Sequence, residues 1–197
     1  MNRWLGQVAA VHAAPALRDW LASPGSLTAR LRAHCLQFDV RLLRQGGAAC
    51  LADQASLVQL ARRGRVAERE VLLVCDGRPV VYAQTVVPAG GSRADWPFFH
   101  AFGSRSLGLA LFQDPRIERG VLQHARLSVR HALARRALAA LPSLDAARVF
   151  HARRCLYRRQ RGLLLVTELF LPAIAQLVPR RRVDTEPDRQ QFDESIF

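Results

Sequence analysis

The sequence contains no lysine, so all 29 of its basic residues are arginines. Against 16 acidic residues they give a formal charge of +13. Twelve of the arginines lie between positions 116 and 161, where the only acids are Glu118 and Asp145. Such a cluster is typical of a surface that binds nucleic acid or an anionic membrane.

The composition also favours a simpler origin for the arginine excess. In a GC-rich genome the codons of arginine and alanine are favoured at solvent-exposed positions, and both residues are abundant in this chain. The aromatic residues on which single-stranded nucleic acids stack do not alternate with the arginines. We therefore expect no nucleic-acid partner, and contact of the arginine-rich face with an anionic membrane stays open as an alternative.

The spacings of metal and redox sites are missing as well. The four cysteines, at positions 35, 50, 75 and 155, form no C-x-x-C pair, and the six histidines form no H-x-x-x-H pair. This predicts no metal site and free thiols in a reducing cytoplasm.

Long apolar runs are missing too. No run reaches the ~20 residues of a membrane-spanning helix, and the short apolar stretch near the N-terminus is interrupted, which argues against a signal peptide. A chain of 197 residues with 50% hydrophobic content fits one domain. We expect a monomer with its domain at residues 1–175 and a disordered tail at 176–197.

Hydrophobic periodicity predicts an α+β fold. Helices are expected at 15–21, 27–35 and 106–112, with Ser26 as an N-cap, and 130–144 is either a helix or an inserted connection. Strands are expected at 36–43, ending at Gly46-Gly47, and at 66–75, 78–88, 121–129, 149–159 and 163–172. Asp76-Gly77 predicts a two-residue hairpin turn. Together these elements predict a single antiparallel sheet of about six strands with flanking helices that enclose a ligand cavity.

The strand predicted at 163–172, LLLVTELFLP, contains one charged residue, Glu168. Alternate residues place Glu168 on one face with Val166 and Phe170. Because both faces are apolar, both are expected to be covered, and a carboxylate there needs a partner. Two interpretations remain open: a structural ion pair with a core arginine, or an acid that faces a ligand in a closed pocket.

Two more polar residues interrupt apolar strand patterns, Arg69 and Gln84. A two-residue turn at Asp76-Gly77 would place Arg69 opposite Gln84 on one face of the hairpin. Arginine is a bidentate receiver for carboxylates, so Arg69 and Glu168 could line a polarised pocket for a hydroxy-acid. The alternative is that Arg69 and Glu168 simply neutralise each other.

Four stretches in this order resemble the chorismate lyase family of ubiquinone biosynthesis: WLASPGSLTARL, EVLLVCDGRPVVYAQTVVP, SLGLALF and HARRCLYRRQRGLLLVTELFLP. The resemblance covers residues 20–172 and is weakest at 121–149. It implies a cofactor-independent lyase that converts chorismate to 4-hydroxybenzoate and pyruvate in an internal cavity closed by flaps.

The resemblance also implies roles for single residues. Arg69 and the backbone N–H of Leu107 would hold the ring carboxylate, Glu168 would contact the ring hydroxyl, and Leu27 would line the hydroxyl end. Gln84 stands where the family often has arginine, and Gln84 is kept as a further substrate-binding candidate. The alternative function is a non-catalytic binding domain for small aromatic acids, like the effector domains of some GntR-type regulators.

Overall fold

The computed structural model describes residues 3–61, 64–90, 95–97, 99, 103, 107–142, 144 and 149–179. Its helices are η1 (Val8–Val11), α1 (Pro15–Ala22), α2 (Leu27–Arg32), α4 (Leu107–Gln113), α5 (Ala132–Ala140) and η3 (Pro172–Gln176). Its strands are β1 (Phe38–Ala49), β2 (Arg65–Cys75), β3 (Arg78–Pro88), β4 (Ile117–Arg119), β5 (Gln123–Ser128), β6 (Val149–Arg159) and β7 (Gly162–Phe170). The predicted disordered tail lies outside the described residues from position 180 on.

The described strands form one antiparallel sheet in the order β1-β2-β3-β7-β6-β4, and β5 also pairs with β6. This confirms the predicted fold class, with seven strands where about six were expected. Strand β4 is the addition, and it pairs with the end of β6 while β5 pairs with its beginning. At the predicted N-cap, the Ser26 side chain accepts a hydrogen bond from the Ala29 N–H.

The hairpin β2–β3 turns at Asp76-Gly77, where both residues have positive φ (48° and 75°), as this type of two-residue turn requires. A bulge follows, because Val74 pairs with Pro79 whereas Leu73 pairs with Val81. The extra residue shifts every later pair by one position.

The predicted pairing of Arg69 with Gln84 is therefore wrong. Arg69 lies opposite Thr85, and Gln84 lies opposite Glu70 on the other face of the sheet. The sequence indicates the turn but contains no clear sign of the bulge that follows it.

Strand β1 is longer than predicted. Gly46 and Gly47 do not end it but pair with Glu68 and Ala67 of β2. This strand lies at the edge of the sheet, where glycine is better tolerated than in a central strand.

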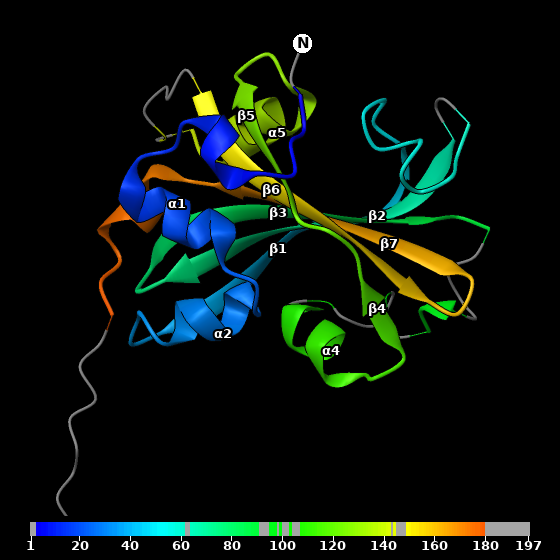
Figure 1. The fold of residues 1–197 in the computed structure, drawn as a ribbon, viewed down its shortest axis with the longest axis horizontal. Helices are drawn as coiled ribbons and strands as arrows, with labels where there is room; N and C mark the ends of the chain where they lie inside the picture. The colour runs from blue at the N-terminus through cyan, green and yellow to red at the C-terminus, as the bar shows by residue number, and fades with distance from the viewer. Residues whose placement is uncertain are drawn as a thin grey trace, which may run out of the picture.

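Elements cover the sheet on both sides, with α2 and α4 on one side and α5 on the other (Figure 1). The cavity face carries Arg69, Val71 and Leu73 of β2, and apolar clusters bury it under α1, α2 and α4. The network face carries Glu68, Glu70 and Leu72 of β2 and packs against α5 and residues 48–60. Each face therefore carries two apolar clusters.

Candidate active site

The cavity face of the sheet forms the floor of a cavity that α2 and α4 cover. The cavity contains about 640 Å³ of atom-free space, its open mouth included. Its walls are mainly apolar, with Leu27, Val71, Leu73, Leu107, Leu111 and Val166 among the lining residues. The charged side chains that line it are Arg69, Arg119, Arg153 and Glu168.

Glu168 lies on β7 directly opposite Arg153 of β6. The Arg153 Nε atom lies 2.5 Å from Oε2 of Glu168, and 3% of the Arg153 side chain is exposed against 17% of Glu168. Arg153 also donates through Nη1 to the carbonyl oxygens of Trp20 (3.2 Å) and Ser23 (2.9 Å). Glu168 is thus paired with a core arginine and also lines the cavity, and its contact with a ligand stays a prediction.

Arg69 is 3% exposed and lies on the same face of the sheet. Its Nε and Nη2 atoms donate to the carbonyl oxygen of Gly103, at 3.1 and 2.9 Å. Burial lowers the pKa of Arg69 to about 10, so the guanidinium remains charged at neutral pH. The arginine that neutralises Glu168 is Arg153, and Arg69 is one of the cations of the cavity.

Leu27 and Leu107 are the first residues of α2 and α4, and both line the cavity. The two helices approach closely, since a Cβ atom at Gly108 would lie 3.0 Å from Oγ1 of Thr28. Glycine at this position therefore lets α4 close over α2. Ser106, which precedes α4, lies outside the described residues.

Gln84 does not belong to this cavity. It is buried on the network face, where its Nε2 atom donates to Oε2 of Glu68 at 2.5 Å. Its Oε1 atom accepts a hydrogen bond of 2.7 Å from Gln54. The bulge in β3 is the cause, because it reverses the face on which Gln84 was predicted.

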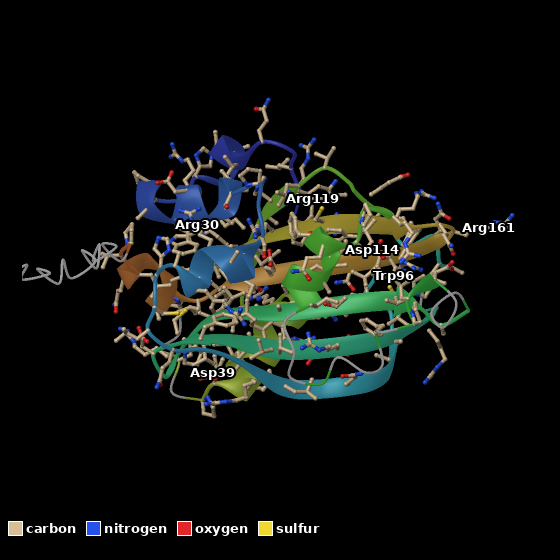
Figure 2. All side chains as sticks on the ribbon, turned by 90° about the horizontal axis from the view of Figure 1, so that it is seen from below. Arg30, Asp39, Trp96, Asp114, Arg119 and Arg161 are labelled. Carbon is tan, nitrogen blue, oxygen red and sulfur yellow. The ribbon has the colours of Figure 1, made fainter. Side chains whose placement is uncertain are left out.

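Sequence reasoning missed Arg119 and Arg153 as cavity residues. The place of Arg153 could have been predicted from the sequence, since a two-residue turn at Gln160-Arg161 puts it opposite Glu168, as observed. The place of Arg119 could not, because β4 has only three residues and shows no periodicity. Figure 2 looks from the side of α2 and α4 and shows Arg119 beside α4.

The described residues contain neither a metal-binding cluster nor a membrane-spanning helix. No group of three or more histidine, cysteine, aspartate or glutamate residues lies close enough to hold a metal ion. None of the described helices has the length and hydrophobicity that crossing a membrane requires. The arginines, the glutamate and the apolar walls of the cavity are residues that could hold a ligand.

The chain was compared with known proteins. Residues 2–182 match the family model described as chorismate lyase. The chain is 48% identical over 163 residues to a protein named "Probable chorismate pyruvate-lyase" of Ralstonia nicotianae, which covers 81% of this chain and 83% of the relative. It is 47% identical over 165 residues to a protein of the same name of Azoarcus sp., which covers 82% and 86% of the two chains.

Solved structures with a similar fold are more distant in sequence. The C-terminal domain of the histidine utilization repressor from Pseudomonas syringae pv. tomato matches with a TM-score of 0.52 and 13% identity, over 74% of this chain and 99% of that one. PhnF from Mycobacterium smegmatis matches with a TM-score of 0.51 and 18% identity, over 77% of this chain and 65% of that one. At such low identity these matches support the fold alone.

Proposed function

Because the chain belongs to the chorismate lyase family, we propose that it converts chorismate to 4-hydroxybenzoate and pyruvate without a cofactor. This reaction is the first committed step of ubiquinone biosynthesis. The observation that supports the proposal most directly is the placement of Arg69 and Glu168 on one face of the sheet, both lining one cavity.

The strand register sets how far apart the two residues lie. Arg69 pairs with Thr85, which pairs with Val166, two residues from Glu168 on β7. Strands about 4.8 Å apart and a rise of about 3.3 Å per residue put the Cα atoms of Arg69 and Glu168 roughly 12 Å apart. That separation leaves room between the two side chains for a six-membered ring with a carboxylate at one end and a hydroxyl at the other.

In the proposed complex, Arg69 and the backbone N–H of Leu107 bind the ring carboxylate. The Glu168 carboxylate accepts a hydrogen bond from the ring hydroxyl, and Leu27 packs beside that end of the ring. Arg153 acts as a positioning residue, because its bonds to Glu168 and to two carbonyl oxygens fix the direction of the carboxylate.

The reaction itself needs no outside reactant. The ether bond between the ring carbon and the enolpyruvyl oxygen breaks, and the hydroxyl-bearing ring carbon loses its hydrogen. The ring becomes aromatic, which supplies the driving force, and the released three-carbon unit takes up the hydrogen as pyruvate. The cavity contributes by orienting the diene, excluding water and stabilising negative charge that develops on the ether oxygen.

An assay of the purified protein tests this proposal. Incubation with chorismate should produce 4-hydroxybenzoate, followed by absorbance, and an equal amount of pyruvate, followed with lactate dehydrogenase. Glu168→Gln and Arg69→Ala should each lower kcat/KM by at least about 100-fold, because each removes a charged contact with the substrate.

Exposed residues of the same types provide the controls. Glu118→Gln on β4 and Arg41→Ala on β1 change solvent-exposed charges and should leave kcat/KM within about twofold. A loss of only a few-fold in both cavity variants would refute the assigned roles. Tight binding of 4-hydroxybenzoate with no turnover of chorismate would instead support a non-catalytic binding domain.

We also infer that the enzyme works as a monomer in the cytoplasm. None of the four cysteines forms a disulfide and all four are buried, which suits a reducing compartment. Light scattering coupled to size exclusion should give the mass of one chain. Flotation with anionic vesicles tests the alternative that the arginine-rich face contacts membranes.

A further inference from the structure

The charges around the cavity do not balance. Three arginines line it, and the one acid among its described lining residues is Glu168, which is paired with Arg153. Arg153 also donates through Nη1 to two carbonyl oxygens, so these donors are occupied by contacts within the protein. Arg119 is a further cation in a largely apolar cavity, and together with the ring-carboxylate site proposed at Arg69 it suits a ligand with two negative charges.

Arg119 is placed to contact such a ligand. It is the last residue of β4 and pairs with Tyr157 of β6, which also lines the cavity. Its guanidinium lies 5.3 Å from the ring centroid of Phe112 in α4 and donates through Nη1 to the carbonyl oxygen of Pro24. These contacts fix the guanidinium between β4, α4 and the loop before α2.

One donor of Arg119 has no acceptor. Its Nε atom is buried and makes no hydrogen bond within the described part of the chain. An unpaired donor on a buried charged group is costly, and such exceptions call for an explanation. The Cys155 thiol lies near this guanidinium: burial raises the pKa of Cys155, whereas the charge of Arg119 and a side-chain hydrogen bond with Arg119 act to lower it.

Arg119 and Arg69 lie far apart along the cavity face. Arg69 lies on β2 and Arg119 on β4, with β3, β7 and β6 between them in the strand order, and Glu168 lies on β7. The proposed substrate has the same arrangement. Its ring carboxylate lies at one end, its hydroxyl at the other, and the enolpyruvyl group with a second carboxylate is attached next to the hydroxyl.

We propose that Arg119 binds the carboxylate of the enolpyruvyl group, with Nε as one of the donors. This inference rests on the proposed function and adds the residue that distinguishes substrate from aromatic product. The product 4-hydroxybenzoate keeps the ring carboxylate and the hydroxyl but has lost the second carboxylate. Arg119 should therefore contribute to the binding of chorismate and not to the binding of 4-hydroxybenzoate, whereas Arg69 should contribute to both.

The test compares Arg119→Gln with Arg69→Ala in the full chain. Arg119→Gln should raise KM for chorismate by at least about tenfold, because a desolvated charge pair is lost, while the inhibition constant of 4-hydroxybenzoate stays within about twofold of wild type. Arg69→Ala should weaken both. Arg119→Lys keeps the positive charge but cannot donate two parallel hydrogen bonds to a carboxylate, so it should give an intermediate KM.

A stable probe gives a readout that does not depend on turnover. We would measure by calorimetry the binding of 3-(carboxymethoxy)-4-hydroxybenzoate, an aromatic compound with a carboxylate on the ring and another on the ether arm. Wild type should bind it more tightly than Arg119→Gln does. Both proteins should bind 4-hydroxybenzoate equally, which also shows that the variant is folded.

The outcomes separate the two proposals. If wild type does not convert chorismate, the proposed function fails whatever Arg119 does. If wild type converts chorismate and Arg119→Gln keeps its KM, or loses affinity for 4-hydroxybenzoate as much as for the two-carboxylate probe, the assignment of Arg119 is wrong while the lyase stands.

Discussion

The two faces of the sheet bury the same kinds of side chain and use them differently. On the network face Glu68 and Glu70 share Arg136 of α5, whose Nη1 atom lies 2.8 and 2.6 Å from their carboxylate oxygens. Gln84 adds a hydrogen bond to Glu68. On the cavity face Glu168 has Arg153, while Arg69 and Arg119 line atom-free space.

Neighbouring residues on one strand show the contrast most directly. Arg153 and Arg154 are adjacent on β6, and their side chains point to opposite faces. Arg153 holds Glu168 at the cavity, whereas Arg154 donates to Gln123 (2.8 Å) and to the carbonyl oxygen of Asp53 (2.9 Å). A buried charge is thus no sign of a site by itself. A functional site is indicated when a cavity lies beside the buried charged group and the ion-pair partner of that group holds it in position.

We expect the largest effect when each of these two arginines is replaced by methionine in a separate variant. Arg153→Met should lower kcat/KM by at least about 100-fold, because Glu168 loses the group that orients it. Arg154→Met should leave kcat/KM within about threefold while it lowers the free energy of unfolding by about 2–4 kcal/mol. Steady-state kinetics and urea unfolding of both variants measure the two effects. Equal losses of activity in the two variants would remove the functional distinction between the faces.

Much of the fold followed from the sequence, because the signals are local. Asp76-Gly77 fixes a turn, Ser26 caps a helix, and the alternation around Glu168 places it with Val166 on one face. Arg69 and Glu168 both line one cavity, which agrees with the pocket interpretation, and their contacts with a substrate stay a prediction. These predictions rest on residue types whose conformational preference is strong.

The errors have non-local causes. One extra residue between Pro79 and Val81 moved Gln84 to the other face, and its fit depends on how Val80 packs against α1 and α2. The role of Arg119 depends on β4, a strand too short to have a period. Register shifts and short edge strands are decided by tertiary packing, which no short window of sequence contains.

The next effect in size concerns Gln84 itself. Gln84→Met keeps the side-chain volume but removes the hydrogen bonds to Gln54 and Glu68. We expect the free energy of unfolding to fall by about 1–2 kcal/mol, with kcat/KM within about twofold of wild type. Thr85→Val, the neighbouring change on the cavity face, is the matched variant, and its effect should appear in KM. A large loss of activity in Gln84→Met would mean that the hydrogen bonds of Gln84 with Gln54 and Glu68 contribute to catalysis.

The smallest effect that we expect concerns the pH range in which groups on each face change the free energy of unfolding. His124 and His151 lie on the cavity face, and their ring nitrogens lie 3.2 and 3.1 Å from the carbonyl oxygens of Leu21 and Val11. Burial lowers the pKa of both histidines below the usual value of about 6.5. As the pH falls through 6.5, the unfolded chain takes up these protons first, so the free energy of unfolding decreases.

Asp53, beside the network face, loses its contribution in the same direction but in a lower pH range. Burial acts to raise its pKa, but hydrogen bonds from His131 and Trp4 lower the pKa overall. The stability that it contributes is present above about pH 3.9, its usual value, and is lost as the pH falls through its folded-state pKa. His124→Gln should therefore flatten the loss of stability between about pH 7.5 and 5.5, whereas Asp53→Asn should lower the free energy of unfolding above about pH 4 and flatten its pH dependence only below about pH 4. Urea unfolding across this range measures both, and overlapping pH windows for the two variants would contradict the assignment.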